Sequence, residues 1–148
     1  MSSIKPDYHT VKELLHSRSF SIDEYQREYK WDSKNIEELL SDLQNKFTQS
    51  YQDGDTPQAV GGYEEYFLGS IIVTKRNNRI YFVDGQQRTT SLTLLLIYLY
   101  RAAKEQGLDV AETMRPLIYS DNFGEKQFNI DIPERIPVVK ALFEGEDY

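Results

Sequence analysis

Apolar residues recur along this chain at helical spacing in several places. The clearest stripe follows the repeat i, i+3, i+4, i+7 and i+11 and consists of Ile36, Leu39, Leu40, Leu43 and Phe47. Such a stripe predicts an amphipathic helix, and Asp32 or Ser33 can cap it. Similar patterns predict further helices over residues 11–18, 88–106, 110–119 and 137–145.

Two apolar runs, Tyr66–Lys75 and Arg79–Gly85, flank a short polar turn with two asparagines, which tolerate left-handed backbone. This pattern predicts a β-hairpin. Because both runs are apolar on both faces, we expect central, covered strands. Residues 20–22 predict a short extended segment, and Lys126–Ile132 alternates like an edge strand. The predicted class is α+β, with a small mixed sheet and a central hairpin flanked by several helices.

Residues 48–65 contain several glycines and a proline without periodicity, which predicts a mobile loop. The chain has 148 residues, a net charge of −7 and no cysteine. The negative charge argues against a stand-alone nucleic-acid binder, although it does not exclude binding through a local patch. The small basic turn Lys75–Arg79 could touch a backbone phosphate, but a turn of this kind is more often a solvated hairpin tip. No apolar run approaches the ~20 residues of a membrane span, and no signal peptide is evident. We expect a cytoplasmic protein without membrane partners.

A polar cluster, Asp84–Thr90, stands between the second predicted strand and a long apolar helix. Gly85 permits a left-handed turn, and the first N–H groups of the helix form an anion site. Arg88 adds a charged fork suited to phosphate. Asp84 is an acceptor for Mg²⁺ or a ribose hydroxyl. A plain structural turn is the simpler interpretation, but capping alone requires neither two glutamines nor an arginine.

A second cluster, Tyr25–Trp31, is rich in aromatic and basic residues. In an extended segment Tyr25, Arg27, Tyr29 and Trp31 share one face. This face is either a surface with cation–π packing or a second wall of the anion site. His9 and His16 have no acidic partner at ligand spacing, so we interpret both as surface residues rather than metal ligands.

The two clusters, in this order, resemble the N-terminal domain of GmrSD-type restriction endonucleases, a family related to the ParB and sulfiredoxin fold. The matching stretches are Tyr25–Trp31, Phe67–Ile72 and Asp84–Leu92. The resemblance covers about Ile22 to Tyr100, and Thr89 stands where the family commonly has leucine. It implies a domain that binds and hydrolyses nucleoside triphosphates in defence against modified foreign DNA. It also implies a separate C-terminal nuclease domain or partner nuclease subunit and an indirect relation to DNA; a homodimer is kept open.

The resemblance also implies roles for individual residues. Arg88 and Arg27 would clamp phosphates, Asp84 would hold Mg²⁺ or a water, and Gln86 or Gln87 would orient the attacking water. The predicted catalytic residues are Asp84, Gln86, Gln87 and Arg88. The predicted nucleotide-binding residues are Tyr25, Gln26, Arg27, Tyr29, Trp31, Gly85, Arg88, Thr89 and Thr90.

Two alternatives to hydrolysis are a module that binds nucleotide or DNA phosphate without turnover, and a nuclease acting in its own right. The nuclease is the least favoured, because the sequence has no cluster of acids or histidines. The last predicted helix is short, and short helices need packing partners. We therefore predict a nucleotide-binding domain over residues 1–125 and the start of a following segment over residues 126–148.

Overall fold

The computed structural model describes residues 6–16, 18–23, 28–122, 125–131 and 136–145. The chain forms two compact units: residues 1–27 with 71–148, and residues 28–70. Residues on both sides of position 125 lie in the first unit, and the domain boundary predicted there stays a prediction. None of the described helices has both the length and the apolar character needed to cross a bilayer.

The second unit contains the helix that the apolar stripe predicts. Helix α2 spans Ser33–Ser50, and Asp32 is its N-cap. The Asn35 N–H donates to the Asp32 carboxylate at 3.0 Å, while the Asp32 N–H donates to the Asn35 side chain at 3.1 Å. This reciprocal capping box satisfies two N–H groups that the helix itself leaves unpaired. The predicted helix and its cap are confirmed.

The segment that follows α2, predicted as a mobile loop, has structure of its own. Helix α2 continues to Ser50, and a 3₁₀ helix, η2, spans Pro57–Gly62. The Tyr63 hydroxyl donates to the Asp55 carboxylate at 2.7 Å. This hydrogen bond raises the pKa of Tyr63 to about 12 and lowers the pKa of Asp55. The glycines and the proline therefore mark a structured connection.

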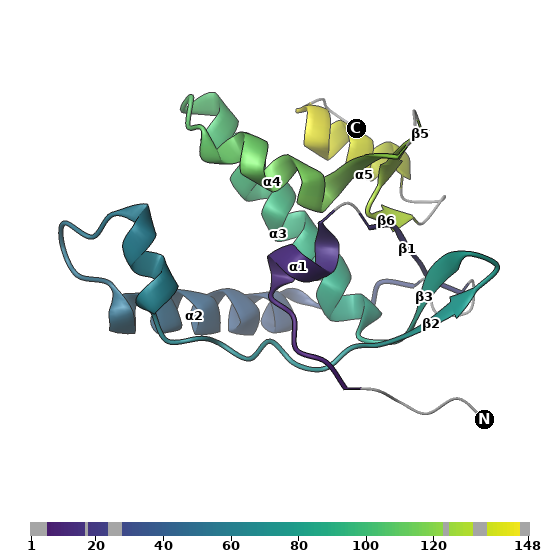
Figure 1. Cartoon of the computed structure of the whole chain (residues 1–148), viewed down its shortest axis with the longest axis horizontal. Helices are drawn as coiled ribbons and strands as arrows, with labels where there is room; N and C mark the ends of the chain where they lie inside the picture. Colours follow the sequence, from purple (N-terminus) through teal and green to yellow (C-terminus); the bar gives the residue numbers. More distant parts are fainter. Residues whose placement is uncertain (1–5, 17, 24–27, 123–124, 132–135, 146–148) are drawn as a thin grey trace. The chain divides into compact units, whose positions relative to one another are not determined.

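The first unit is built on a four-stranded mixed sheet in the order β2-β3-β1-β6 (Figure 1). The strands are β1 Phe20–Ser21, β2 Ile72–Arg76, β3 Arg79–Asp84 and β6 Ile130–Asp131. Strands β2 and β3 form an antiparallel hairpin, whereas β1 pairs in parallel with both β3 and β6. The predicted α+β class with a small mixed sheet and a hairpin is confirmed.

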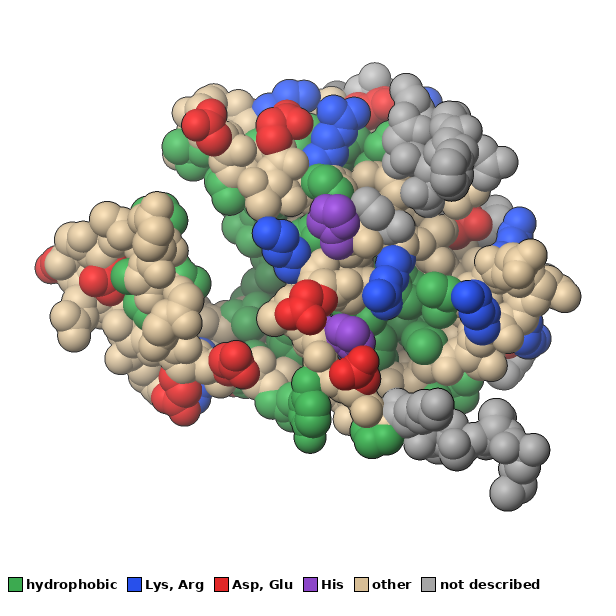
Figure 2. Space-filling view, viewed as in Figure 1, with side chains coloured by type: hydrophobic (Ala, Val, Ile, Leu, Met, Phe, Trp, Pro, Cys, Tyr) green, Lys and Arg blue, Asp and Glu red, His purple; other side chains and the backbone are tan. Residues whose placement is uncertain are grey.

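Two details of the predicted hairpin are wrong. Strand β2 begins only at Ile72, and Gly69, within the predicted run, has a φ of 126°. Strand β2 also lies at the edge of the sheet and is exposed along its whole length, and Val83 of β3 is 48% exposed. Figure 2 shows basic side chains over this hairpin, at the right of the view. A run of apolar residues therefore did not mean that other elements cover both faces of the strand.

Four α-helices and a second, two-stranded sheet complete the first unit among the described residues. The helices are α1 Val11–Leu15, α3 Gln86–Glu105, α4 Val110–Ile118 and α5 Ile136–Glu144. Strands β4 Tyr119–Asn122 and β5 Glu125–Phe128 form an antiparallel pair. The predicted edge strand over 126–132 is thus wrong as one element, because β5 and β6 belong to different sheets; Ile132 lies outside the described residues.

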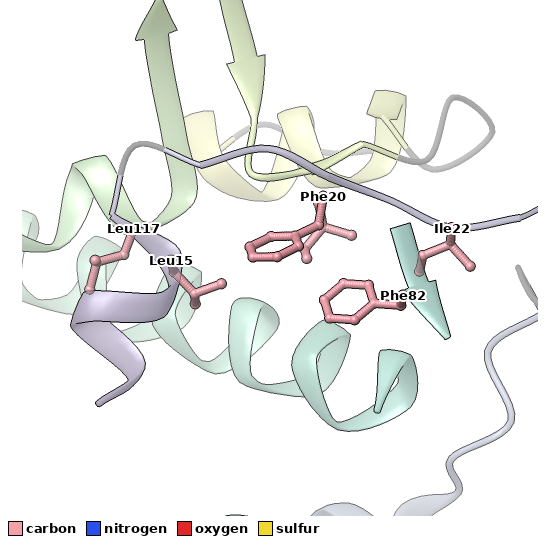
Figure 3. Packing of buried hydrophobic residues seen from close by; sticks show 6 residues of the cluster. Leu15, Phe20, Ile22, Phe82 and Leu117 are labelled. Carbon is pink, nitrogen blue, oxygen red and sulfur yellow. The ribbon is translucent and has the colours of Figure 1, made fainter. Parts of the chain in front are cut away.

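The main core joins the sheet to the helices. Phe20 of β1 and Phe82 of β3 stack with ring centroids 4.9 Å apart (Figure 3). Leu15 of α1 and Leu117 of α4 close the same cluster. Full burial of a large apolar side chain contributes about 1.5–3 kcal/mol to the free energy of folding. The core therefore fixes β3, and with it the end of the strand where the polar cluster begins.

Asn129 lies between β5 and β6 and is fully buried. Its side-chain N–H groups donate to the carbonyls of Leu15 at 2.6 Å and Pro116 at 2.8 Å, and its side-chain oxygen accepts from the Ser120 hydroxyl. Its backbone N–H donates to the Ile118 carbonyl, and its own carbonyl accepts from the Phe20 N–H. One side chain thus connects α1 and α4 at the point where the chain changes sheets.

Candidate functional site

The polar cluster forms a tight turn between β3 and α3. Strand β3 ends at Asp84, Gly85 has the left-handed angles φ 91° and ψ 7°, and α3 begins at Gln86. The Asp84 carboxylate accepts a hydrogen bond from the Gly85 N–H at 2.9 Å. The helix begins two residues earlier than its apolar pattern predicts, so Gln86, Gln87 and Arg88 form its first turn.

Gly85 is required for two separate reasons. Its φ of 91° is strained for any residue with a Cβ, and a Cβ there would lie 2.5 Å from Cγ2 of Ile71. Ile71 is a contact that the sequence reasoning missed, because nothing in the run Phe67–Ile72 marks which isoleucine approaches the turn. The backbone of the turn therefore packs closely against Ile71, the residue that precedes β2.

Replacing Gly85 by alanine is expected to destabilise the protein by about 2–4 kcal/mol, the sum of left-handed strain and an overpacked contact. The matched control is Gly107→Ala, since Gly107 has a φ of 68° but nothing within 4 Å of the added Cβ. It should cost only the strain, about 1–2 kcal/mol. Urea unfolding measures the free energy of unfolding of both variants. An equal loss of stability in the two would show that the contact with Ile71 is unimportant.

The N-terminus of α3 has no side-chain cap. In contrast, Thr10 caps α1 by accepting from the Glu13 N–H at 3.1 Å, and Asp32 caps α2. Unpaired N–H groups at a helix N-terminus favour a bound anion. The glycine at the N-cap therefore leaves this helix end without an acceptor side chain of its own.

Hydroxyl side chains in the first turns of α3 bond to the helix backbone. The hydroxyls of Thr89, Ser91 and Thr93 each donate to the carbonyl four residues earlier, at 2.9, 2.8 and 2.9 Å. Thr89 is 2% exposed, and Thr90 is also buried. In this arrangement Thr89 supports the turn by bonding to Gly85, and the phosphate-binding role of Thr89 and Thr90 stays a prediction.

The three long side chains of the first helical turn differ in their surroundings. All three residues are half-buried. The side-chain oxygen of Gln86 is buried and has no hydrogen-bond partner, the only side-chain atom of this kind among the described residues. Gln87 interacts within the protein. For Arg88, no carboxylate partner is found in the described ranges.

The sheet topology brings the exit of β1 to the same edge as the turn. Because β1 and β3 are parallel, with Ser21 beside Tyr81, both strands leave the sheet at the same edge. Strand β6 ends there as well, with Asp131 beside Ser21. In open sheets, ligands bind outside the carboxyl ends of parallel strands. The segment after β1 holds Tyr25, Gln26 and Arg27, which lie outside the described residues.

Tyr29 and Trp31 belong to the second unit. Both are half-buried, whereas Glu28 and Lys30 are exposed. This alternation agrees with the extended segment that the sequence predicts. The predicted role of Tyr29 and Trp31 in nucleotide binding stays a prediction.

The donor set at the turn can be compared with the needs of Mg²⁺. Among the described residues, no three His, Asp or Glu side chains come together as metal ligands. Contrary to the sequence reasoning, His9 has acidic partners. Its Nε2 lies 3.1 Å from a carboxylate oxygen of Asp7, and its Nδ1 lies 3.6 Å from a carboxylate oxygen of Glu13, one helical turn away.

At the turn, Asp84 has one carboxylate oxygen engaged by the Gly85 N–H. Mg²⁺ commonly uses one or two carboxylates together with substrate phosphates and waters, so Asp84 fits an ion that arrives with a nucleotide.

A family match covers most of the chain. Residues 11–145 match the family described as GmrSD restriction endonuclease, N-terminal domain. The match includes the turn Asp84–Thr90 and every described helix and strand of the first unit, from α1 to α5. No curated protein matches the sequence.

Proposed function

The chain belongs to the family of GmrSD restriction endonuclease N-terminal domains, and from this premise we propose that it binds a nucleoside triphosphate at the turn Asp84–Thr90 and hydrolyses it. Family membership makes it a module of a restriction and phage-defence system. The nucleotide step would couple this module to a nuclease domain or subunit that cuts modified foreign DNA. The observation that carries the proposal is the buried, unpartnered oxygen of Gln86 beside an uncapped helix end.

Phosphate binding is supported by the backbone and by Arg88. The uncapped start of α3 offers N–H groups and the positive end of the helix dipole. Arg88 lies in the same helical turn and, among the described residues, has no carboxylate to neutralise it. A planar guanidinium can bind two phosphate oxygens at once. These groups supply the positioning and charge neutralisation that phosphoryl transfer needs.

The water-positioning role is better supported for Gln86 than for Gln87. A buried acceptor left without a donor costs about 1–3 kcal/mol. A phosphate oxygen cannot satisfy the Gln86 oxygen, because both are acceptors. A water molecule can, and it then lies beside the phosphate site, as nucleophilic attack requires. Gln87, in contrast, already interacts within the protein.

Mg²⁺, when bound with the nucleotide, would neutralise charge on the phosphates. Asp84 is the residue that would meet it, through the carboxylate oxygen that Gly85 does not engage. Asp84 also holds the turn by accepting from the Gly85 N–H. Replacing Asp84 would therefore affect both the backbone of the turn and the binding of the ion. Replacing Gln86 is the more informative test.

The Gln86→Leu variant tests the proposal directly. It is expected to lower phosphate release on the order of 10²-fold or more, while nucleotide affinity changes only a few-fold. The unfolding midpoint should stay constant or rise, because leucine removes an unsatisfied buried oxygen. Phosphate release and calorimetric nucleotide binding give the two readouts.

The matched control is Gln87→Leu, the same substitution at the neighbouring position, which should retain more activity. Unchanged hydrolysis in Gln86→Leu would show that this residue does not position water. If the wild-type chain bound nucleotides without releasing phosphate, the domain would be a non-catalytic binding module instead.

A further inference from the structure

Positive charge gathers at the tip of the β2–β3 hairpin, in a chain whose net charge is −7. Lys75, Arg76 and Arg79 surround the turn residues Asn77 and Asn78, and all three basic residues are exposed. We refer to Lys75, Arg76 and Arg79 as the hairpin cations. In Figure 1 the loop between β2 and β3 projects away from α3 and α4, and Figure 2 shows basic side chains around this region.

The tip has a defined backbone. Asn77 and Asn78 have φ values of 51° and 64°, the left-handed pair that a two-residue hairpin turn requires. This turn type matches the natural twist of the two strands. The hairpin cations are therefore presented on a regular, tightly closed hairpin.

The fold itself uses one of the three hairpin cations. Nη2 of Arg76 donates to the Asp23 carboxylate at 2.7 Å, and its guanidinium lies 4.2 Å from the centre of the Tyr81 ring. Asp23 follows β1, so this ion pair fastens the tip of the hairpin to the centre of the sheet. Arg76 is thus a positioning residue.

The other two hairpin cations have no structural role of this kind. Within the described residues, neither Lys75 nor Arg79 forms an ion pair. Arg79 lies directly opposite Arg76 across the hairpin, and like charges in this position are destabilising. Lys75 lies opposite Ile80, on the other face. The fold therefore gives no reason for a cation at position 79, whereas a polyanionic partner would.

We propose that the tip of this hairpin binds the phosphate backbone of duplex DNA through Lys75 and Arg79. A restriction system acts on duplex DNA, and the chain's overall negative charge leaves only a local basic surface able to approach it. Two cations on opposite faces of a narrow hairpin can reach phosphates without reading bases. The contact is sequence-independent, weak and sensitive to salt. It depends on family membership and not on nucleotide hydrolysis.

The test is a titration of fluorescently labelled duplex DNA with the full chain at several salt concentrations. The Lys75→Gln/Arg79→Gln variant is expected to bind on the order of tenfold more weakly at low salt. Its plot of log affinity against log salt concentration should be shallower by about two, as two phosphate contacts are lost. The matched control is Lys104→Gln/Lys140→Gln, which removes two exposed cations of α3 and α5. It should keep the wild-type salt slope.

An equal loss in the control variant, or no binding of the wild-type chain to duplex DNA at low salt, would overturn the proposal. Arg79→Gln alone should keep or raise the unfolding midpoint, because it removes a like-charge pair, so that lost binding is not caused by unfolding. Phosphate release measured without DNA should be unchanged in the double variant. The experiments can therefore disprove the proposed hairpin contact and the proposed nucleotide site independently of each other.

Discussion

Replacing Arg88 by alanine is expected to lower nucleoside-triphosphate hydrolysis on the order of 10³-fold, the effect typical of an arginine that stabilises charge in phosphoryl transfer. Arg88 lies in the first turn of α3, beside Gly85 and Gln86. Alanine removes the charge without disturbing a described ion pair. The measurement is phosphate release at saturating nucleotide, together with circular dichroism to show that the variant is folded.

Arg101→Ala is the matched control, since Arg101 is also a half-buried arginine of α3 but lies near the other end of the helix. It should retain hydrolysis near the wild-type rate, even though it loses its contact with Glu105. Arg88→Lys should recover part of the activity, because lysine keeps the charge but not the planar fork. Full activity in a folded Arg88→Ala variant would show that the turn is not the hydrolytic site.

Replacing Asn129 by alanine is expected to cost about 3–5 kcal/mol of folding free energy, which is large for one side chain. Alanine removes the side-chain donors to the carbonyls of Leu15 and Pro116 and the acceptor of the Ser120 hydroxyl. The Leu15 carbonyl then keeps the longer bond from the Arg18 N–H, at 3.4 Å. Alanine also leaves a cavity at a position that is completely buried. Urea unfolding followed by tyrosine fluorescence measures the loss of folding free energy.

Gln127→Ala is the control for Asn129→Ala, because Gln127 lies two residues away on β5 and is exposed. A change within about 0.5 kcal/mol is expected there. Asn129→Asp should be at least as damaging as alanine, since a carboxylate would present acceptors to the two carbonyls. A loss below about 1 kcal/mol in Asn129→Ala would mean that water replaces the missing donors.

Features set by neighbouring residues were predictable from the sequence. The apolar stripe and Asp32 gave α2 and its cap, and the asparagine pair gave the hairpin turn. Gly85 gave the position of the turn before α3. Each of these depends on interactions within a few residues, where side-chain spacing and backbone preference determine the outcome.

Features that depend on distant residues were not predictable. The alternation over Lys126–Ile132 gave no sign that Asn129 is buried, because the partners of its side chain come from α1, α4 and β4. The edge position of β2 follows from the pairing order of the sheet, which an apolar run does not reveal. The distinction between Gln86 and Gln87 required the true start of α3, two residues before the first apolar positions suggested.

The parallel pairing around β1 has a consequence for folding during synthesis on the ribosome. Residues 20 and 21 pair with residues 80 and 81 on one side and with residues 130 and 131 on the other. Contacts between such distant residues close slowly and late in folding. The edge that carries the turn is therefore completed only after residue 131 has left the exit tunnel. A nascent chain is expected to hold no nucleotide until almost the whole domain has been synthesised.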